Sequence, residues 1–503
     1  MYGRRMRRMT DVPPSATSVS TSGLGFRLAW NGPVCYNRNR CAMADEYIEG
    51  TVRDRADGAD EADEYIRDIP FHVAINAHLL SGRAWYRSAG VHQYIHHLLR
   101  YLGQRGADEA DEAGADGGTS GGYTDTYTRL RYTVLLGEGV LPPDVADGGD
   151  EADEADEYIR EYIPRLPVLR SRWPTSRATV RVVWEQVAQP WVLRRIGADL
   201  VHGPAFVGPV LASCPAVVTI HDLSFLRFPA LFRPANRLYL AVLTRLSARR
   251  ARRLIAVSAE TASEVTRLLG VPAERIDVVY HGVDPMFRPL PAGEVAAFRQ
   301  RRGLPERFVL FVGTLEPRKN LVRLVEAFAR IRAGADRHIG ARLVLAGGKG
   351  WLYDELFARV EALGLGEQVT FPGYVASDEL PLWYNAATVL AYPSIYEGFG
   401  LPVLEAQACG TPVLTSNVSS LPEAAGEAAL MVDPYDVEAL AAGLHRLLVD
   451  EPLRHELRER GLAHAGQFSW PRAAQETARV YRRALAEGPQ RVGDSVTDQR
   501  EGR

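Results

Sequence analysis

Short apolar runs alternate along this chain with longer segments in which apolar residues recur every three or four positions. The first kind predicts buried strands, and the second predicts amphipathic helices. In the first part of the chain the strand-like runs are 71–77, 131–137, 215–222, 253–258 and 276–282. The helix-like segments there are 91–104, 236–252 and 259–270. The pattern is continued by segments 178–197 and 198–204. In the second part the strand-like runs are 307–313, 341–347, 368–374, 388–394, 411–416 and 428–433, with helix-like segments at 320–333, 351–364, 436–449, 452–467 and 471–486. This alternation is typical of parallel sheets with crossover helices, so it predicts an α/β fold.

A linker with three prolines, 283–295, divides the pattern into two sets. A chain of 503 residues is also longer than one hydrophobic core usually organises. We therefore predict two doubly wound domains, residues 70–285 and residues 286–470.

Acidic, low-complexity segments interrupt the first set. The segment 57–70 has a near copy at 149–164, and shorter relatives lie at 44–50 and 106–118. Such segments bury too little apolar surface to offset chain ordering. We expect disordered tails at 1–69 and 489–503 and inserts near 106–122 and 146–164 that act either as tolerated surface insertions or as acidic interaction arms.

Composition narrows the function classes. The net charge of −3 does not favour nucleic acid, and the four cysteines at 35, 41, 214 and 409 form no C-x-x-C pair, which suits a reducing cytosol rather than a metal site. No run of 18 apolar residues occurs, and a polar tract follows the basic N-terminus. We therefore expect a cytoplasmic protein with neither a membrane-spanning helix nor a secretory signal.

The segment 396–410, YEGFGLPVLEAQACG, has the layout of strand, glycine-rich turn and helix. Glycine allows close backbone approach to a ligand, and the following helix N-terminus presents unpaired N–H groups to an anion. Glu397 and Glu405 flank this turn, at the carboxyl edge of an open sheet, where α/β folds bind ligands. The combination favours a ligand with both hydroxyls and phosphate, such as a nucleotide sugar.

A second turn, 313–321, also follows a strand and opens a helix. It carries Arg318 and Lys319, two cations beside a helix N-terminus, which suits a diphosphate. For Arg318 a solvent-facing position is the alternative.

These two motifs resemble those of the family 4 retaining glycosyltransferases, whose signature is E-x7-E, and the likeness spans roughly residues 71–488. The resemblance implies the GT-B architecture: two Rossmann-like domains that face each other across a cleft, with a C-terminal helix, here 471–488, that crosses back to the N-terminal domain.

The resemblance also implies residue roles. Glu405 would bind the ribose hydroxyls, and Glu397 would bind the transferred sugar or lie near its reacting carbon. Thr314 stands where many relatives have an arginine, a departure for which Arg318 is the candidate replacement. The implied catalytic residues are His221, Asp222, Lys319 and Glu397, and the implied donor-binding residues are Gly90, Gly313, Thr314, Arg318, Lys319, Gly373, Tyr374, Val375, Gly398, Phe399, Gly400, Leu401 and Glu405.

From the family we expect a retaining, metal-independent hexosyltransferase that needs no cofactor and uses a nucleotide sugar, GDP-mannose favoured, as donor. Segments 184–202 and 220–229 resemble a bacterial branch that makes polysaccharide, so the expected partner is a glycan or lipid-linked acceptor. The arginine run 248–253 is either a contact with the inner membrane leaflet or a solvated helix face. A GT-B sugar-nucleotide epimerase and a non-catalytic binding relative are the alternatives.

Overall fold

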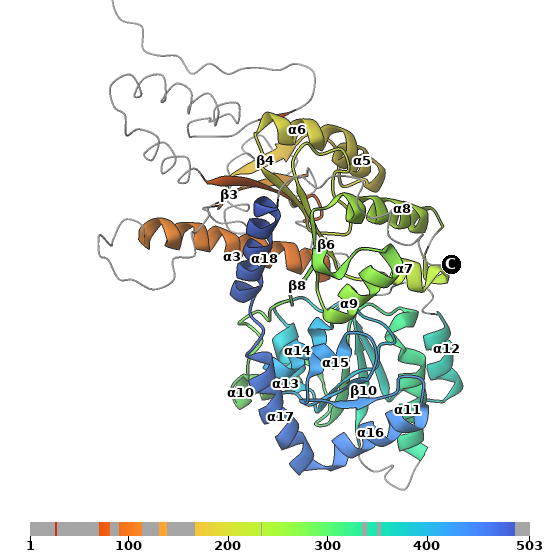
Figure 1. Cartoon of the computed structure of the whole chain (residues 1–503). Helices are drawn as coiled ribbons and strands as arrows, with labels where there is room; N and C mark the ends of the chain where they lie inside the picture. The colour runs from red at the N-terminus through yellow and green to blue at the C-terminus, as the bar shows by residue number, and fades with distance from the viewer. Residues whose placement is uncertain are drawn as a thin grey trace, which may run out of the picture.

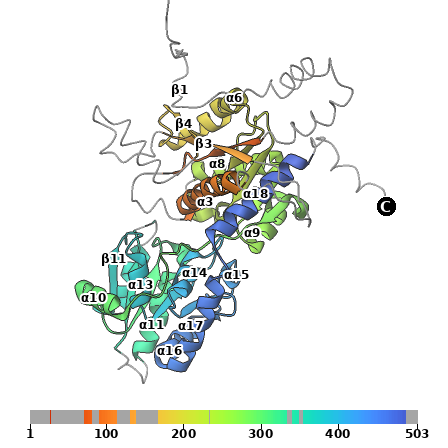
Figure 2. The same cartoon turned by 90° about the vertical axis from the view of Figure 1, so that its left-hand side faces the viewer.

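The computed structural model describes residues 26–27, 70–80, 90–112, 130–137, 166–232, 234–333, 340–348, 350 and 354–487. The expectations for the tails and for most of the acidic inserts lie outside these residues. The described chain forms two α/β domains stacked one above the other, each with a central sheet between helices (Figures 1 and 2).

The N-terminal domain contains an eight-stranded sheet of order β1-β4-β3-β2-β5-β6-β7-β8, in which only β1 pairs antiparallel among the described strands. Its strands are β1 Phe26–Arg27, β2 Phe71–Asn76, β3 Leu130–Leu136, β4 Val168–Ser171, β5 Leu200–Gly203, β6 Ala216–Ile220, β7 Arg253–Ala256 and β8 Ile276–Val278. Its helices are α3 Gly90–Glu112, α5 Ala178–Val183, η4 Trp184–Ala188, α6 Gln189–Arg195, α7 Ser224–Arg227, η5 Pro229–Leu231, α8 Pro234–Arg250, α9 Ala259–Glu264, η6 Val265–Leu269 and η7 Ala273–Arg275.

The C-terminal domain contains a six-stranded parallel sheet of order β11-β10-β9-β12-β13-β14. Its strands are β9 Phe308–Val312, β10 Arg342–Ala346, β11 Val369–Gly373, β12 Val389–Tyr392, β13 Val413–Ser416 and β14 Leu430–Val432. Its helices are α10 Ala292–Arg302, η8 Pro317–Lys319, α11 Leu321–Ala333, α12 Asp354–Ala362, α13 Leu380–Ala386, α14 Leu401–Ala408, α15 Leu421–Ala425, α16 Val437–Val449 and α17 Glu451–Ala465, and α18 Trp470–Ala486 follows. The predicted α/β fold with two doubly wound domains is thus confirmed.

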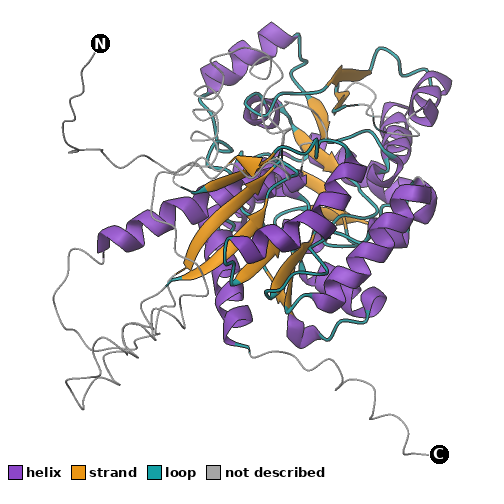
Figure 3. Ribbon diagram, turned by 90° about the horizontal axis from the view of Figure 1, so that it is seen from above, coloured by secondary structure: helices purple, strands orange, loops and turns teal. Residues whose placement is uncertain are grey.

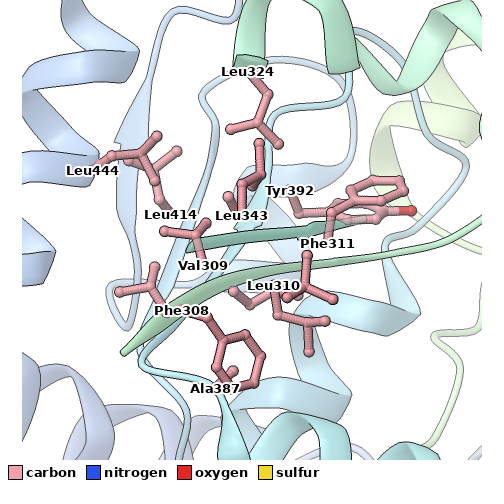
Figure 4. Close-up of a cluster of buried hydrophobic side chains, with 14 of the residues drawn as sticks. Phe308, Val309, Leu310, Phe311, Leu324, Leu343, Ala387, Tyr392, Leu414 and Leu444 are labelled. Atoms are coloured by element: carbon pink, nitrogen blue, oxygen red, sulfur yellow. The ribbon is translucent and has the colours of Figure 1, made fainter. Parts of the chain in front are cut away.

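Both faces of each sheet are buried, which explains why the strands appear in the sequence as continuous apolar runs. In the C-terminal domain, Phe308, Leu310 and Leu343 are fully buried between helices (Figure 4). In the N-terminal domain, Ile75 and its neighbours of like orientation pack on α3 and α18, whereas Ala74 belongs to the core under η4 and α6. The alternation of side chains along each strand produces this division.

Helix α18 returns to the N-terminal domain and runs beside α3 (Figure 2). Its apolar stripe, including Trp470, Ala474 and Tyr481, joins the core of that domain. The Tyr481 hydroxyl also lies 2.7 Å from Nδ1 of His202 on β5. The last helix therefore fastens the two domains together after the chain has already crossed between them once.

Several elements differ from the sequence pattern. The four-residue strand β4 was not predicted, and it pairs with β1, inside the segment 1–69 for which we expected disorder. A π-helical turn at Trp184–Ala188 interrupts the segment 178–197 just before Pro190, whose ring and missing N–H disturb regular helical bonding. Helix α3 continues to Glu112, into the acidic insert.

Candidate active site

The turns after β9 and β12 lie side by side because the strand order of the C-terminal sheet reverses between these two strands. At such a switch point the crossover helices leave on opposite faces, and the diverging loops form the crevice in which open α/β sheets bind ligands. The turn after β9 carries Arg318 and Lys319, and the turn after β12 carries Glu397. The fold thus brings together the two motifs that the sequence indicated.

Lys319 and Glu397 form a buried ion pair, in which the Lys319 ammonium contacts Oε1 of Glu397 and donates to the Tyr392 hydroxyl at 2.7 Å. Burial raises the pKa of Glu397, but the charges of Lys319 and Arg318 outweigh it and hold this pKa at about 2. The backbone of Glu397 is also fixed, since its carbonyl accepts from the hydroxyls of Ser419 at 2.8 Å and Ser420 at 2.9 Å. Glu397 is therefore an ionised, oriented carboxylate.

Arg318 is not solvent-facing. Its guanidinium contacts Glu316, lies 3.3 Å from Oε2 of Glu397 and 3.9 Å from Oδ2 of Asp222 in the other domain. Burial by itself would lower the pKa of Arg318, but the three carboxylates outweigh this effect. The net shift raises the pKa, so the guanidinium stays charged. Two cations thus face three carboxylates, and a diphosphate would have to exchange with a carboxylate at Arg318 rather than meet free positive charge.

His221 and Asp222 follow β6 and reach the interdomain contact. Asp222 Oδ1 accepts from the backbone N–H of Ser224 at 3.0 Å and from its hydroxyl at 2.7 Å, which fixes the start of α7. The His221 imidazole is buried, and its Nε2 lies 2.8 Å from the Pro204 carbonyl. Burial lowers the pKa of His221, so the ring is neutral and donates to that carbonyl.

The turn between Glu397 and α14 packs directly on the N-terminal domain. A side chain at Gly398 would bring its Cβ within 1.8 Å of the His221 carbonyl oxygen, so only glycine fits there. The Gly398 carbonyl accepts from the Ser258 hydroxyl at 2.7 Å. Gly400, with a φ of 121°, then precedes α14. The Phe399 ring is buried 5.6 Å from the ring of Tyr280, in a small apolar cluster that Leu401 also joins.

The other predicted donor-binding positions lie at the same edge of the C-terminal sheet. Gly313 has a φ of 147°, and a Cβ added at this position would lie 3.9 Å from Cε of Lys319. Gly373, with a φ of 82°, accepts from the N–H of Gly347 at 2.7 Å. Tyr374 beside it is exposed, and Val375 packs on the core. The methyl group of Thr314 lies 2.8 Å from the place where a Cβ at Gly350 would be.

Glu405 lies on α14, where its Oε2 accepts from the Tyr384 hydroxyl at 2.7 Å. Burial raises the pKa of Glu405 to about 7, and the charge of Asp284 adds to this effect. Hence the carboxyl group that the resemblance assigns to ribose is close to half-protonated at neutral pH. Gly90, the remaining predicted position, opens α3, and among the described residues no atom is found within 4 Å of the place where its Cβ would be.

Comparison with known proteins identifies the family. The family "Glycosyltransferase Family 4" matches residues 142–287, and "Glycosyl transferases group 1" matches residues 295–464. The chain is 37% identical over 296 residues to O-antigen chain mannosyltransferase B of Escherichia coli, which is 58% of this chain and 77% of that protein. It is 39% identical over 420 residues to a D-inositol 3-phosphate glycosyltransferase of Acidothermus cellulolyticus, covering 80% of this chain and 87% of that protein.

The chain is a family 4, group 1 glycosyltransferase. Its fold is similar to that of Anabaena HepE, solved in complex with UDP and glucose, with a TM-score of 0.59 at 19% identity over 82% of this chain and all of that one. The predicted family and its GT-B fold are therefore confirmed.

In this glycosyltransferase a second polar cluster lies in the N-terminal domain, at the carboxyl ends of β2 and β3, and was missed from the sequence. The Asn76 amide donates to Oε1 of the buried Glu185 at 3.1 Å, and the His78 ring lies 3.9 Å from the ring of Trp184. Within the described chain, both ring nitrogens of His78, Nε1 of Trp184 and the Thr175 hydroxyl are buried without a hydrogen-bond partner. We call Asn76, His78, Thr175, Trp184 and Glu185 the N-domain polar cluster.

Buried polar groups are nearly always paired, so this cluster calls for an explanation. Burial raises the pKa of Glu185 to about 7, against the lowering effect of Arg181 and of the bond from Asn76. One signal was present in the sequence: Glu185 is the lone acidic residue in the segment 178–195.

Only part of the arginine run of this glycosyltransferase lies on the outside: Arg249 and Arg250, at the end of α8, are exposed, whereas Arg252 is half-buried and Arg253 is buried. Arg252 donates to the carbonyls of Ala484 and Glu487 at the end of α18, at 2.7 and 2.6 Å. Arg253 is buried against Asp277. The two arginines that follow α8 point inward because the chain turns there into β7, so neither alternative drawn from the sequence holds for them.

Proposed function

We propose that this glycosyltransferase moves a hexose, with mannose favoured, from a nucleoside-diphosphate sugar to a glycan or lipid-linked acceptor, with retention of configuration and without a metal ion or cofactor. The name of the Escherichia coli relative, O-antigen chain mannosyltransferase B, supports mannose and a polysaccharide product. The name of the other relative carries D-inositol 3-phosphate, so this compound belongs among the acceptors to be tested.

The observation that carries the proposal is the ionised Glu397 at the sheet switch point, which is paired with Lys319 and also contacts Arg318, whose guanidinium reaches Asp222 across the domain contact. A carboxylate held beside the reacting sugar stabilises the positive charge that develops on its ring carbon. The N-terminus of α14 and its preceding glycines offer N–H groups to the departing diphosphate. Arg318 can exchange its long contacts with Glu397 and Asp222 for a phosphate oxygen.

Retention follows if the acceptor attacks from the side that the diphosphate leaves. In that geometry the leaving phosphate takes the acceptor's proton, and no side chain need act as a nucleophile. The protein contributes positioning and fixed charge, which supply a large share of the barrier reduction in such reactions.

The N-domain polar cluster is the proposed acceptor side. It lies at the carboxyl edge of the same sheet as His221, separated along that sheet by β5 between β2 and β6. A carboxyl group, an amide and an imidazole with spare hydrogen-bonding capacity suit sugar hydroxyls, since each can donate or accept. Acceptor hydroxyls would give these groups the partners they lack.

We also propose peripheral contact of the enzyme with the inner membrane leaflet. None of the helices in the described part of the chain is both long enough and apolar enough to cross a bilayer. A lipid-linked acceptor would then have to be reached from the bilayer surface.

The test is a donor and acceptor screen with product analysis. Purified protein is incubated with GDP-mannose, GDP-glucose, UDP-glucose and ADP-glucose, first alone, to measure slow hydrolysis, and then with lipid-linked glycan and inositol 3-phosphate acceptors. We expect GDP-mannose to give an α-linked product, in the presence of EDTA as well as in its absence. A β-linked product, or loss of turnover on chelation with recovery on adding Mg²⁺, would overturn retention or metal independence respectively.

The same screen separates the two alternatives from the sequence. A sugar-nucleotide epimerase would convert the donor without an acceptor, and the change would appear in the donor pool. A non-catalytic relative would bind a nucleotide sugar and leave it intact. The intact pair of Lys319 and Glu397 argues for turnover.

A further inference from the structure

Two neighbouring helical segments of the N-terminal domain turn apolar stripes toward solvent. On α5, η4 and α6 the exposed residues are Val183, Val187 and Trp191, and on α8 they are Leu238, Val242 and Leu246. In each set the residues recur every four positions, so they line one side of their helix. In a globular protein such a stripe normally faces the core, whereas here between 41% of Leu246 and 67% of Val187 is exposed.

A loop joins the two stripes into one surface. Gln186 of η4 bonds the carbonyl of Gly208 and the N–H of Val210, both at 3.1 Å. From the other side, the Ser247 hydroxyl of α8 accepts from the N–H of Gly208 at 3.1 Å. Leu211, which is 74% exposed, therefore lies between the helices.

We call this surface the apolar face: Val183, Val187, Trp191, Leu211, Leu238, Val242 and Leu246. These are seven of the eleven large apolar side chains that are exposed among the described residues. Figure 1 shows α5, α6 and α8 gathered on one side of the N-terminal domain, away from the last helix, and Figure 3 shows from above that helices surround the strands. An apolar patch of this kind on a soluble domain marks a surface that binds something.

On the two helical segments of the apolar face, the exposed charges are of one sign. Helix α8 contains no aspartate or glutamate, and its exposed Arg245 and Arg249 share the face of Val242. On the other segment Arg194 and Arg195 are exposed, and its lone acid, Glu185, is buried. The chain as a whole has a net charge of −3, so this arrangement is local.

From these observations we infer that the apolar face docks on an anionic lipid bilayer. Apolar side chains enter the boundary between head groups and acyl chains, while surrounding arginines bind lipid phosphates. A second copy of the chain is a poorer fit, because the arginines of a symmetric pair would meet one another. The docking is independent of the donor, but its use, which is to present a lipid-linked acceptor, rests on the proposed function.

The position of the apolar face agrees with this use. The segment that exposes Val183 and Val187 outward buries Trp184 and Glu185 inward, as part of the N-domain polar cluster. One helical segment therefore separates the bilayer from the proposed acceptor site.

The test is sedimentation of the full chain with vesicles, in the absence of donor and acceptor. We compare phosphatidylcholine vesicles with vesicles of equal parts phosphatidylcholine and phosphatidylglycerol, at low and high salt. Wild type is expected to bind the anionic vesicles and to lose binding as salt rises. The double variant Val187→Glu with Leu238→Glu should lower the bound fraction at least about ten-fold, because each carboxylate opposes both insertion and the anionic surface.

Matched controls remove similar groups elsewhere. Val449→Glu changes an apolar residue that is 48% exposed in the C-terminal domain, and it should bind like wild type. Arg245→Gln with Arg249→Gln should weaken binding and flatten its salt dependence, whereas Arg301→Gln with Arg479→Gln should not. Turnover with a water-soluble acceptor should be unchanged in all of these variants, which shows that they fold.

Two kinds of result would overturn the inference. One concerns the vesicles: binding that is equal for wild type and the Val187→Glu, Leu238→Glu variant, or binding that does not depend on phosphatidylglycerol. The other is a wild-type dimer in light scattering that this variant converts to a monomer, which would assign the apolar face to a second copy. Neither result depends on the donor, so failure of the proposed transfer reaction would be seen separately.

Discussion

At the scale of single residues, the protonation of a buried carboxyl group in this glycosyltransferase depends on the groups that are buried beside it. Glu397 and Glu405 belong to the same sequence signature, yet the structure treats them differently. The cations beside Glu397 hold its pKa at about 2, whereas burial without a cation raises the pKa of Glu405 to about 7. The same side chain thus becomes a permanent anion at one position and a titrating group at the other.

The ion pair of Lys319 and Glu397 can be tested by removing one partner and then both. Lys319→Met leaves a carboxylate buried beside Arg318 alone, and we expect it to lower the free energy of unfolding by roughly 3 kcal/mol. The double variant Lys319→Met, Glu397→Gln should regain most of that loss, because no charge is stranded. Neither variant should transfer sugar. Urea unfolding and turnover measure the two effects, and a single variant as stable as wild type would contradict the buried pair.

Glu185 predicts a pH dependence of stability. Its pKa in the folded protein, about 7, is higher than the ordinary value of 4.5, so folding favours the protonated form. The stabilisation is therefore complete below about pH 4.5 and is lost as pH rises through about 7, by at most about 3 kcal/mol. Glu185→Gln should flatten the urea midpoint between pH 5 and pH 8. Equal slopes for the variant and wild type would show that Glu185 is ionised throughout.

At the scale of elements, helix termini and glycine turns make the contact between the domains. The carboxylate of Glu423, on α15, accepts from the N–H groups of Ala259 at 2.7 Å and Glu260 at 2.8 Å, at the start of α9 in the other domain. It also accepts from the Tyr280 hydroxyl at 3.0 Å. A side chain of one domain thus caps a helix of the other, which favours a negative charge there.

This interdomain cap should help to hold the two domains in the contact that the structure shows. Glu423→Ala leaves two N–H groups of α9 without their charged acceptor, and we expect roughly a tenfold loss in kcat/KM for the donor. The radius of gyration in solution scattering should increase in the variant. Glu427→Ala is the matched control, since Glu427 is exposed just after the same helix. If both variants behave alike, the hydrogen bonds of Glu423 do not help to hold the two domains together.

At the scale of the whole molecule, α18 is joined to the N-terminal domain through a charge cluster in which Arg253 and Asp277 are buried. Arg253 contacts Asp277 and Glu487, and Asp277 also pairs with Arg483 on α18. This arrangement joins β7, β8 and the last helix. It explains why Arg253, which belongs to an arginine run that looks like a surface feature in the sequence, is structural in the fold.

Arg253→Gln is therefore expected to destabilise the protein rather than to alter its surface. Removing this buried cation leaves Asp277 with Arg483 alone and should cost roughly 3 kcal/mol. The neighbouring Arg249→Gln, which removes an exposed charge on α8, should change stability by less than about 0.5 kcal/mol. Thermal unfolding of the two variants compares them directly, and similar midpoints would refute the buried role of Arg253.

The sequence by itself determined the alternation of strands and helices, the division at the prolines, and the two glycine-bearing turns that follow β9 and β12. Each of these depends on local periodicity or on the conformational freedom of glycine, which neighbouring residues encode. It did not reveal strand β4, the π-helical turn before Pro190 or the N-domain polar cluster. Strand β4 and the polar cluster depend on contacts with segments far away in the chain, whereas the π-helical turn is a local irregularity that the apolar pattern does not signal.

Only the tertiary structure decided the electrostatic partners. Arg318 meets Asp222, Arg253 meets Glu487, and Glu423 meets the start of α9 across long stretches of sequence. A side chain's pKa and role depend on how deeply it is buried and on which charges lie within a few ångströms. Those distances are set when the sheets, the crossover helices and α18 pack together, and no pattern along the chain contains them.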